Sequence, residues 1–162
     1  MKADFQYGRY LARHKWFVFV AGLKTKAPLW RLIIHDWSKL GRLEWCAYRD
    51  FFYGFEINPV MTVLIKERRR VFDVAWLHHI HLNKHHWNHH CIVDGDERET
   101  LKVLKMPEKY VREMVADWAG AGRAITGKWE VKEWYETKKE QILLHPDTRV
   151  LVEKLLGEVT FT

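Results

Sequence analysis

The chain has 162 residues, of which 48% are hydrophobic and 14% are aromatic. This composition excludes an intrinsically disordered chain, and the length suits one domain, residues 1–162, which can bury a core without disulfide bonds. The 27 basic and 21 acidic side chains give a formal net charge of +6, which permits an anionic partner such as nucleic acid but identifies none.

Apolar periodicity and the positions of proline predict a mainly helical chain. Each of the four prolines precedes an apolar periodic run, and proline is favoured in the first turn of a helix because it loses no hydrogen bond there. The expected helices span residues 4–23, 28–39, 43–53, 59–82, 107–119, 129–143 and 146–156. Two apolar fragments around a DG turn predict a small β-hairpin within residues 91–104. The predicted fold class is therefore all-α, a bundle of about six to seven helices.

The cellular location is predicted from the cysteines and from the first apolar run. Cys46 and Cys91 lie far apart and form no paired-cysteine motif, which favours a reducing compartment. The apolar run at residues 16–23 is short for a bilayer span, is followed by Lys24 and Lys26, and has no convincing cleavage site after it. We therefore expect a cytoplasmic protein with no membrane association.

Seven of the ten histidines lie in one segment, AWLHHIHLNKHHWNHH at residues 75–90. Neutral imidazole is the commonest side-chain metal ligand, so this histidine tract predicts a metal site. If the helix continues through the tract, one face presents several imidazoles; if Asn83 ends the helix, the following HHW turn folds back. Individual histidines of the tract are also expected to cap the helix, to face solvent or to stack on Trp76 and Trp87.

Other segments direct ionisable side chains toward the core. His14 and Asp117 each lie on the apolar face of an expected helix, and the His35-Asp36 pair follows three apolar residues without a polar break. A buried carboxylate is costly unless it is paired or bound to a cation. A metal ion would compensate these groups, which reach the core from different helices.

The order of these residues carries a resemblance to a known family. His14, then His35-Asp36, then the histidine tract, then Asp117 resembles the H…HD…D signature of the HD-domain metal-dependent phosphohydrolases. The resemblance implies an HD-like helical bundle that hydrolyses phosphoester bonds, many of them in nucleotides. The segments RHKWFVF, LIIHDWSK, AWLHH…NKHHW and MVADWAGAGRA also resemble an uncharacterised family of small phage and bacterial proteins over nearly the whole chain, which implies no reaction.

The HD resemblance implies a metal centre built from seven residues. One divalent ion would be held by the residues of the signature, and Asp36 would bridge it to a second ion held by histidines of the tract. The implied ligands are His14, His35, Asp36, His79, His85, His86 and Asp117. This mixture of imidazoles and carboxylates does not choose among Mn²⁺, Fe²⁺, Co²⁺, Zn²⁺ and Mg²⁺.

The implied reaction is phosphoester hydrolysis by a metal-activated water, with a nucleotide or another small phosphoester as the substrate. Asp36, Lys39 and Glu44 are the predicted catalytic residues. Lys39 stands where HD nucleotidases often carry an acidic residue, and Glu44 is the candidate to replace that residue. Lys39 would hold the phosphate as a charged donor, and Lys15 and Arg123 are further candidates for this role.

Two segments resemble phosphate-binding elements but have simpler interpretations. The basic run KERRR at residues 66–70 is either the solvated face of a helix, which we favour, or a patch for nucleic acid or phosphate. The segment GRAITGK at residues 122–128 matches the first seven positions of a phosphate loop, but Trp129 stands where Ser or Thr is needed and a helix precedes the segment. We interpret it as a helix C-terminal turn. The alternatives to an enzyme are a metal-stabilised nucleic-acid-binding protein and a phage interaction protein without catalysis.

Overall fold

The computed structural model of the chain describes residues 2–54, 62–93 and 101–161. The α-helices in these ranges are α1 (Lys2–Thr25), α2 (Leu29–Ile34), α3 (Arg42–Tyr53), α4 (Thr62–Leu82), α5 (Glu108–Thr126), α6 (Val131–Lys138) and α7 (Pro146–Glu158). Two short 3₁₀ helices, η1 (Trp37–Leu40) and η3 (Trp87–His90), and two strands, β1 (Cys91–Val93) and β2 (Leu101–Val103), complete the described elements. This arrangement confirms the predicted all-α fold class with a small hairpin.

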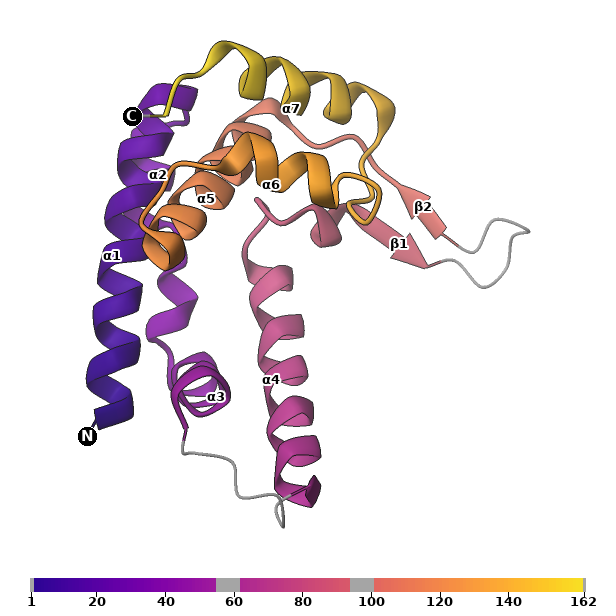
Figure 1. Ribbon diagram of the computed structural model, residues 1–162. Helices are drawn as coiled ribbons and strands as arrows, with labels where there is room; N and C mark the ends of the chain where they lie inside the picture. Colours follow the sequence, from indigo (N-terminus) through magenta and orange to yellow (C-terminus); the bar gives the residue numbers. More distant parts are fainter. Residues whose placement is uncertain (1, 55–61, 94–100, 162) are drawn as a thin grey trace.

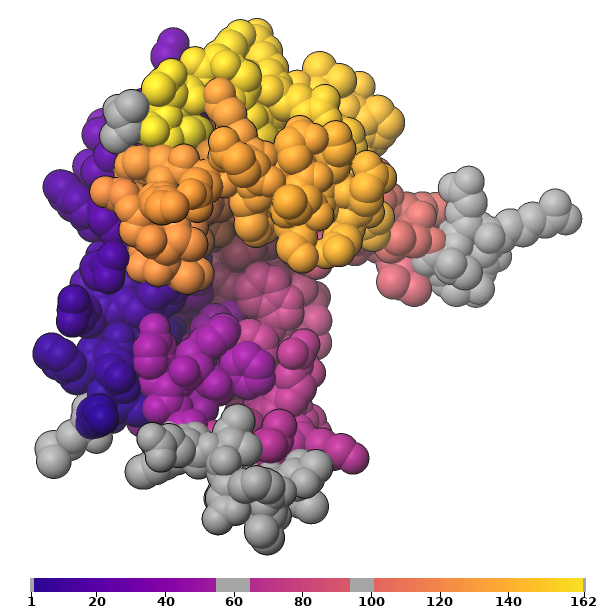
Figure 2. Space-filling model, in the orientation of Figure 1, coloured from indigo at the N-terminus to yellow at the C-terminus, as the bar shows by residue number. Residues whose placement is uncertain are grey.

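Helices α1 and α5 form the central pair of the bundle (Figure 1). They approach closely at Gly120 of α5, where a β-carbon would lie 2.5 Å from the backbone nitrogen of Val18. Helix α7 packs on α5 near the end of α1, while α3 packs on α4 and on the first half of α1. In the space-filling view the strands β1 and β2 lie at the edge of the molecule (Figure 2).

Two hydrophobic clusters lie on either side of His14 along α1. One cluster joins the second half of α1 to α5, α6 and α7 and includes Val18, Met114, Tyr135 and Val152. The other joins the first half of α1 to α3 and α4 and consists of the buried residues Tyr7, Ala47, Tyr48 and Ala75. Complete burial of a large apolar side chain contributes about 1.5–3 kcal/mol. Each cluster therefore holds its helices together. The polar side chains near His14 lie between the two packed clusters.

Two helix boundaries differ from the prediction for reasons seen in the tertiary structure. Helix α5 was expected to end at residue 119, but it continues through Gly120 and ends at Gly127, which has a positive φ of 80°. The close packing on α1 favours glycine in the middle of this helix. Helix α6 was expected to reach residue 143, but it ends at Lys138, and the guanidinium of Arg149 donates to the carbonyl oxygens of Lys139 and Ile142. The side chain of Arg149 thus replaces the helical hydrogen bonds.

The hairpin lies where the sequence predicts it. Strands β1 and β2 are antiparallel, with Cys91 opposite Val103 and Val93 opposite Leu101. The predicted DG turn of the hairpin and the predicted start of the fourth helix at Pro59 lie outside the described residues. Among the described residues, no helix combines the length and the apolar character that crossing a bilayer requires.

Candidate metal centre

Imidazole and carboxylate side chains from five segments meet between the two hydrophobic clusters. They come from α1, the turn after α2, α4, the loop before η3, and α5. None of the residues is more than 9% exposed. The members are the seven predicted metal ligands, namely His14, His35, Asp36, His79, His85, His86 and Asp117. Burial of two carboxylates among five imidazoles is costly unless a cation compensates the negative charge.

The turn after α2 directs two adjacent side chains into this centre. The predicted continuous helix over residues 28–39 is wrong, because α2 ends at Ile34 and Asp36 has left-handed backbone angles, with φ 53° and ψ 28°. Left-handed angles cost an L-residue about 1–2 kcal/mol, and aspartate is one of the residues that adopts them most readily. In a helix, side chains of adjacent residues diverge by about 100°. The turn instead lets His35 and Asp36 face the same centre.

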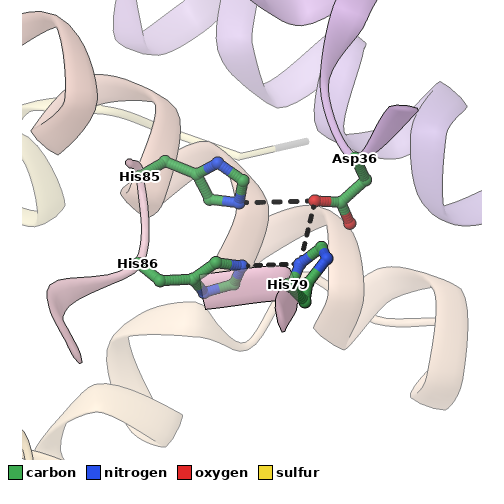
Figure 3. A group of neighbouring side chains, drawn as sticks. All are labelled: Asp36, His79, His85 and His86. Atoms are coloured by element: carbon green, nitrogen blue, oxygen red, sulfur yellow. Dashed lines mark hydrogen bonds and ion pairs between the residues drawn. The ribbon is translucent and has the colours of Figure 1, made fainter. Parts of the chain in front are cut away.

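The carboxylate of Asp36 lies between two sets of imidazoles. Its Oδ2 is 3.1 Å from Nε2 of His14 and 3.5 Å from Nε2 of His35. Its Oδ1 is 3.3 Å from Nε2 of His79 and 3.5 Å from Nε2 of His85 (Figure 3). Each oxygen of Asp36 therefore belongs to a different set of potential ligands.

Asp117 completes the first set from the opposite side. Its Oδ1 lies 3.3 Å from Nε2 of both His14 and His35, and its Oδ2 lies 3.7 Å from Nε2 of His85. Two groups of four residues result, and within each group the potential ligand atoms lie within 4.8 Å of one another. The first group is His14, His35, Asp36 and Asp117, and the second is Asp36, His79, His85 and His86.

Two outer glutamates set the orientation of the imidazoles. Nδ1 of His79 donates to Oε2 of Glu44 at 2.8 Å, and Nδ1 of His35 donates to Oε1 of Glu113 at 3.1 Å. Nδ1 of His85 lies 3.3 Å from the same oxygen of Glu113. A ring that carries its proton on Nδ1 presents the lone pair of Nε2, and an outer carboxylate commonly fixes this tautomer in metal-binding histidines. When the rings are neutral, the glutamates thus turn the Nε2 atoms of His35 and His79 into acceptors that face the centre.

Several potential ligand atoms of the centre lack a suitable hydrogen-bond partner in the described part of the chain, and a cation would satisfy them. Among the described residues, Oδ1 of Asp36 and Nε2 of His85 are buried and have no hydrogen-bond partner. The Nε2 atoms of His79 and His86 face each other at 2.9 Å (Figure 3). Two imidazole lone pairs repel at this distance unless a proton or a metal ion lies between them. The buried groups could hold a metal ion, and their mixed nitrogen and oxygen atoms suit a divalent one.

The protein's own cations compensate part of the negative charge. Burial favours the neutral form of Asp36, but the charges of His35 and Lys39 outweigh burial and hold the pKa of this carboxyl well below its usual range. Burial likewise opposes the charged form of His35, but the charge of Asp36 and the hydrogen bonds with Asp117 and Glu113 raise its pKa to about 10. Burial lowers the pKa of three other imidazoles, those of His14, His85 and His86.

The predicted catalytic residues occupy different places around the centre. Nζ of Lys39 lies 2.5 Å from Oδ2 of Asp36, and the lysine side chain is 12% exposed. Glu44 lies behind the tract histidines as an outer carboxylate and is completely buried. The ammonium of Lys15 donates to the backbone oxygen of His35. The guanidinium of Arg123 instead lies over two aromatic rings, 5.6 Å from that of Phe17.

The histidine tract divides into residues that face the centre and residues that do not. Helix α4 ends at Leu82, so the alternative in which the chain folds back after the helix holds. The imidazole of His78 bonds to Glu44 at 2.8 Å. The other three imidazoles outside the centre, those of His81, His89 and His90, bond to backbone carbonyl oxygens.

Glu113 and its partner Arg31 are the residues that sequence reasoning missed. Glu113 is 1% exposed, and Oε2 of its carboxylate pairs with Nε of Arg31. The guanidinium of Arg31 also lies 4.4 Å from the centroid of the Tyr110 ring. A signal was present in the sequence, because Glu113 precedes Asp117 by one helical turn and therefore shares its face of α5.

The two other phosphate-like segments have the contacts that their simpler interpretations predict. In the KERRR run, Arg69 and Arg70 pair with acidic side chains of the same helix at 2.9 and 2.7 Å, and Arg68 donates to a backbone oxygen. These contacts favour the solvated helix face. The GRAITGK segment contains the last turns of α5 and its C-terminal Gly127, as the interpretation of a helix end predicts.

Comparison with known proteins yields one match. The sequence profile described as a family of unknown function (DUF5662) matches residues 3–158, nearly the whole chain. No curated protein and no solved structure shows significant similarity.

Proposed function

The chain belongs to the DUF5662 family of unknown function, and we propose that it is a metal-dependent phosphohydrolase whose two divalent ions share Asp36. The observation that carries the proposal is the place of this carboxylate. One of its oxygens faces His14 and His35, and the other faces His79 and His85. A carboxylate between two ligand sets can hold two cations a few ångströms apart, as in two-metal hydrolytic sites.

Each set of residues supplies both imidazole and carboxylate ligands for one ion. The first set, with Asp117, offers two carboxylates and two imidazoles; the second, with His86, offers one carboxylate and three imidazoles. Divalent ions held there would acidify a water molecule and neutralise charge on phosphoryl oxygens. The outer carboxylates Glu44 and Glu113 keep the Nε2 lone pairs of His79 and His35 directed inward, which makes these two imidazoles better ligands.

The lysines beside the centre favour a substrate with a phosphoryl group. The ammonium of Lys39 is close to the shared carboxylate of Asp36, and Lys15 reaches the backbone of His35. An ammonium in a nearly buried place attracts a phosphate oxygen more strongly than one in bulk water, because the local dielectric constant is lower. Lys39 would hold the phosphoryl group, and its charge would stabilise the more negative transition state.

The order of the residues along the chain supports the same reaction. His14, His35-Asp36 and Asp117 follow the H…HD…D signature, and all of them lie in one of the two groups. The substrate class that the resemblance implies is a nucleotide or another small phosphoester. The nucleic-acid-binding alternative relied on the KERRR run, whose arginines are engaged within the protein. No observation favours that alternative over the enzyme.

Metal analysis combined with a phosphate-release screen tests the proposal. Purified protein should contain a divalent metal by mass spectrometry and should release phosphate from at least one member of a panel of nucleotides and small phosphoesters. Asp36→Asn is the informative variant, because asparagine keeps the shape of the side chain and also tolerates left-handed angles. It should lose bound metal and lower the release rate by about a hundredfold or more, since it removes the shared ligand.

The matched control is Asp73→Asn, which removes an exposed carboxylate from α4 without touching the centre. This variant should retain metal and activity. Charge reversal at Arg68, Arg69 and Arg70 should also leave turnover unchanged. In a nucleic-acid-binding protein the same change would lower the affinity for nucleic acid and reduce the salt dependence of that affinity. Phosphate release by Asp36→Asn at the wild-type rate would contradict the proposal.

A further inference from the structure

A pocket opens on the surface next to the metal centre. It has a volume of about 320 Å³, which falls within the range of about 300–1,000 Å³ typical of small-molecule sites. Its lining comes from the first half of α1, the end of α3 and the end of α5, and consists of Gln6, Arg9, Tyr10, Arg13, Tyr53 and Ala124. The first half of α1, drawn in indigo, lies open at the surface beside α3 (Figure 2).

Tyr10 connects this pocket to the metal centre. Its ring stacks on the imidazole of His14, with a centroid distance of 5.9 Å and an interplanar angle of 18°. His14 in turn contacts Asp36 and Asp117. A ligand in the pocket would therefore lie one aromatic ring away from a metal ligand.

The charge of the pocket favours an anion. Arg9 and Arg13 are exposed and lie one turn apart on α1, where two like charges repel each other. Within the described ranges, no hydrogen bond or ion pair engages either guanidinium. Two other pockets contain carboxylates: one is lined by Glu136 and Glu153, and another by Asp50 and Glu67. The pocket beside Tyr10 contains cations without acidic side chains, and an anionic ligand would relieve their repulsion.

The aromatic lining adds a second requirement for the ligand. Tyr10 and Tyr53 both line the pocket, and tyrosine rings provide flat surfaces on which a nucleobase can stack. Base stacking on an aromatic side chain stabilises complexes of proteins with nucleic acids and does not depend on which base is present. Two arginines and two tyrosines around one small pocket therefore match a ligand that has both phosphate groups and an aromatic base.

We propose that this pocket binds a nucleotide with at least two phosphate groups. Arg9 and Arg13 bind the phosphate groups, while Tyr10 and Tyr53 contact the base. Nucleotides of this kind are then the substrate class that we assign to the neighbouring metal centre. This assignment of the substrate rests on the proposed phosphohydrolase function, but the binding pocket itself can be tested without catalysis.

Calorimetric titration in excess EDTA measures binding without turnover. The probes are adenosine 5′-diphosphate, adenosine and inorganic pyrophosphate. Wild-type protein should bind the diphosphate more tightly than adenosine or pyrophosphate, because only the diphosphate offers both a base and phosphates. The double variant Arg9→Gln/Arg13→Gln should weaken diphosphate binding by about tenfold or more and leave adenosine binding unchanged, since charged hydrogen bonds are lost.

The charge-matched control is Arg69→Gln/Arg70→Gln on α4, which should bind the diphosphate as the wild type does. The pocket variant should also melt at the wild-type temperature or above, because it removes a repulsive pair. Tyr53→Leu should lower the affinities for the diphosphate and for adenosine by the same factor and leave the affinity for pyrophosphate unchanged.

The outcomes distinguish failure of the proposed binding site from failure of the proposed phosphohydrolase function. Three results would refute the proposed binding site, even if the protein hydrolyses another phosphoester. They are an unchanged diphosphate affinity in Arg9→Gln/Arg13→Gln, equal affinities for the diphosphate and pyrophosphate, and no diphosphate binding at all. Loss of diphosphate binding in this variant supports the pocket. If metal-loaded wild-type protein then releases no phosphate from any nucleotide, the phosphohydrolase proposal fails and the binding site stands.

Discussion

Replacing Glu113 with glutamine tests whether the outer carboxylates support the metal centre. Glu113 accepts a hydrogen bond from Nδ1 of His35 at 3.1 Å and lies 3.3 Å from Nδ1 of His85. Glutamine keeps the size of the side chain and one oxygen but removes the charge that both imidazoles and Arg31 face. Loss of such an outer partner typically lowers metal affinity by about 10–100-fold. This loss corresponds to about 1.4–2.7 kcal/mol of binding free energy.

The same free energy should appear in thermal stability. With metal in excess over the dissociation constants of both proteins, the stabilisation by metal falls by the amount of binding free energy that is lost. In a domain of this size, 1 kcal/mol shifts the melting temperature by about 2–4 °C. The metal-dependent rise in melting temperature should therefore be smaller in Glu113→Gln by about 3–11 °C.

Two measurements check this expectation, a competition titration with a chelator of known affinity and melting curves with and without metal. Glu108→Gln is the matched control, because Glu108 lies on the same helix in an exposed pair with Arg112. The control should match the wild type in both measurements. If Glu113→Gln bound metal as tightly as the wild type and kept the full metal-dependent rise, the proposed role of the outer carboxylate would be refuted.

Three further predictions concern the centre and the helix pair around it. Excess EDTA should lower the melting temperature of the purified wild-type protein, and Asp117→Asn should reduce this response, because it removes a ligand of one of the two groups; identical wild-type curves with and without EDTA would count against a resident metal. The metal-free protein should lose stability between about pH 7 and pH 10 in denaturant titrations. The folded pKa of His35, about 10, lies above its ordinary value of 6.5, so the stabilisation by this proton is complete below pH 6.5 and disappears as the pH rises through 10. His35→Gln should flatten this dependence, and an equally steep slope in the variant would exclude His35 as its source. Gly120→Ala should destabilise the protein by about 1–3 kcal/mol, because the new β-carbon meets the backbone of α1, whereas Gly122→Ala, with open space around it, should be neutral or stabilising by about 1 kcal/mol. Equal unfolding free energies for the two alanine variants would contradict the close approach of α1 and α5.

The extent to which the fold is predictable depends on how locally each element is determined. The sequence predicts the helices over residues 4–23, 43–53 and 146–156 to within two residues at either end, because their apolar stripes, and the proline that begins the last of them, lie within the helices themselves. The prediction of a helix over residues 28–39 is wrong, since the left-handed Asp36 is held by partners on α1 and α4. A local pattern contains no information about those partners.

The residues of the candidate centre likewise differ in whether the local sequence reveals them. An ionisable residue on an apolar face is conspicuous, and this criterion alone selects His14 and Asp117 from the sequence. Glu113 escaped selection because it lies next to Arg112 in a charged stretch and is typical of a solvated position. Its burial results from Arg31 and His35, which reach it from another part of the chain. Which histidines of the tract face inward likewise depends on the turn after Leu82, which residue spacing alone left open.

The pairing of α1 with α5 determines when the protein can fold during synthesis. Helix α1 ends at residue 25 and α5 ends at residue 126, so about a hundred residues are added between them. At about 5–20 residues per second, this interval lasts roughly 5–20 s. For that time the face of α1 that contains Val18 and Ala21 has no partner, and the ligand set lacks Asp117. The ligand group of His14, His35, Asp36 and Asp117 can therefore form only after α5 has been synthesised, whereas the group of Asp36, His79, His85 and His86 lies entirely before α5 in the sequence.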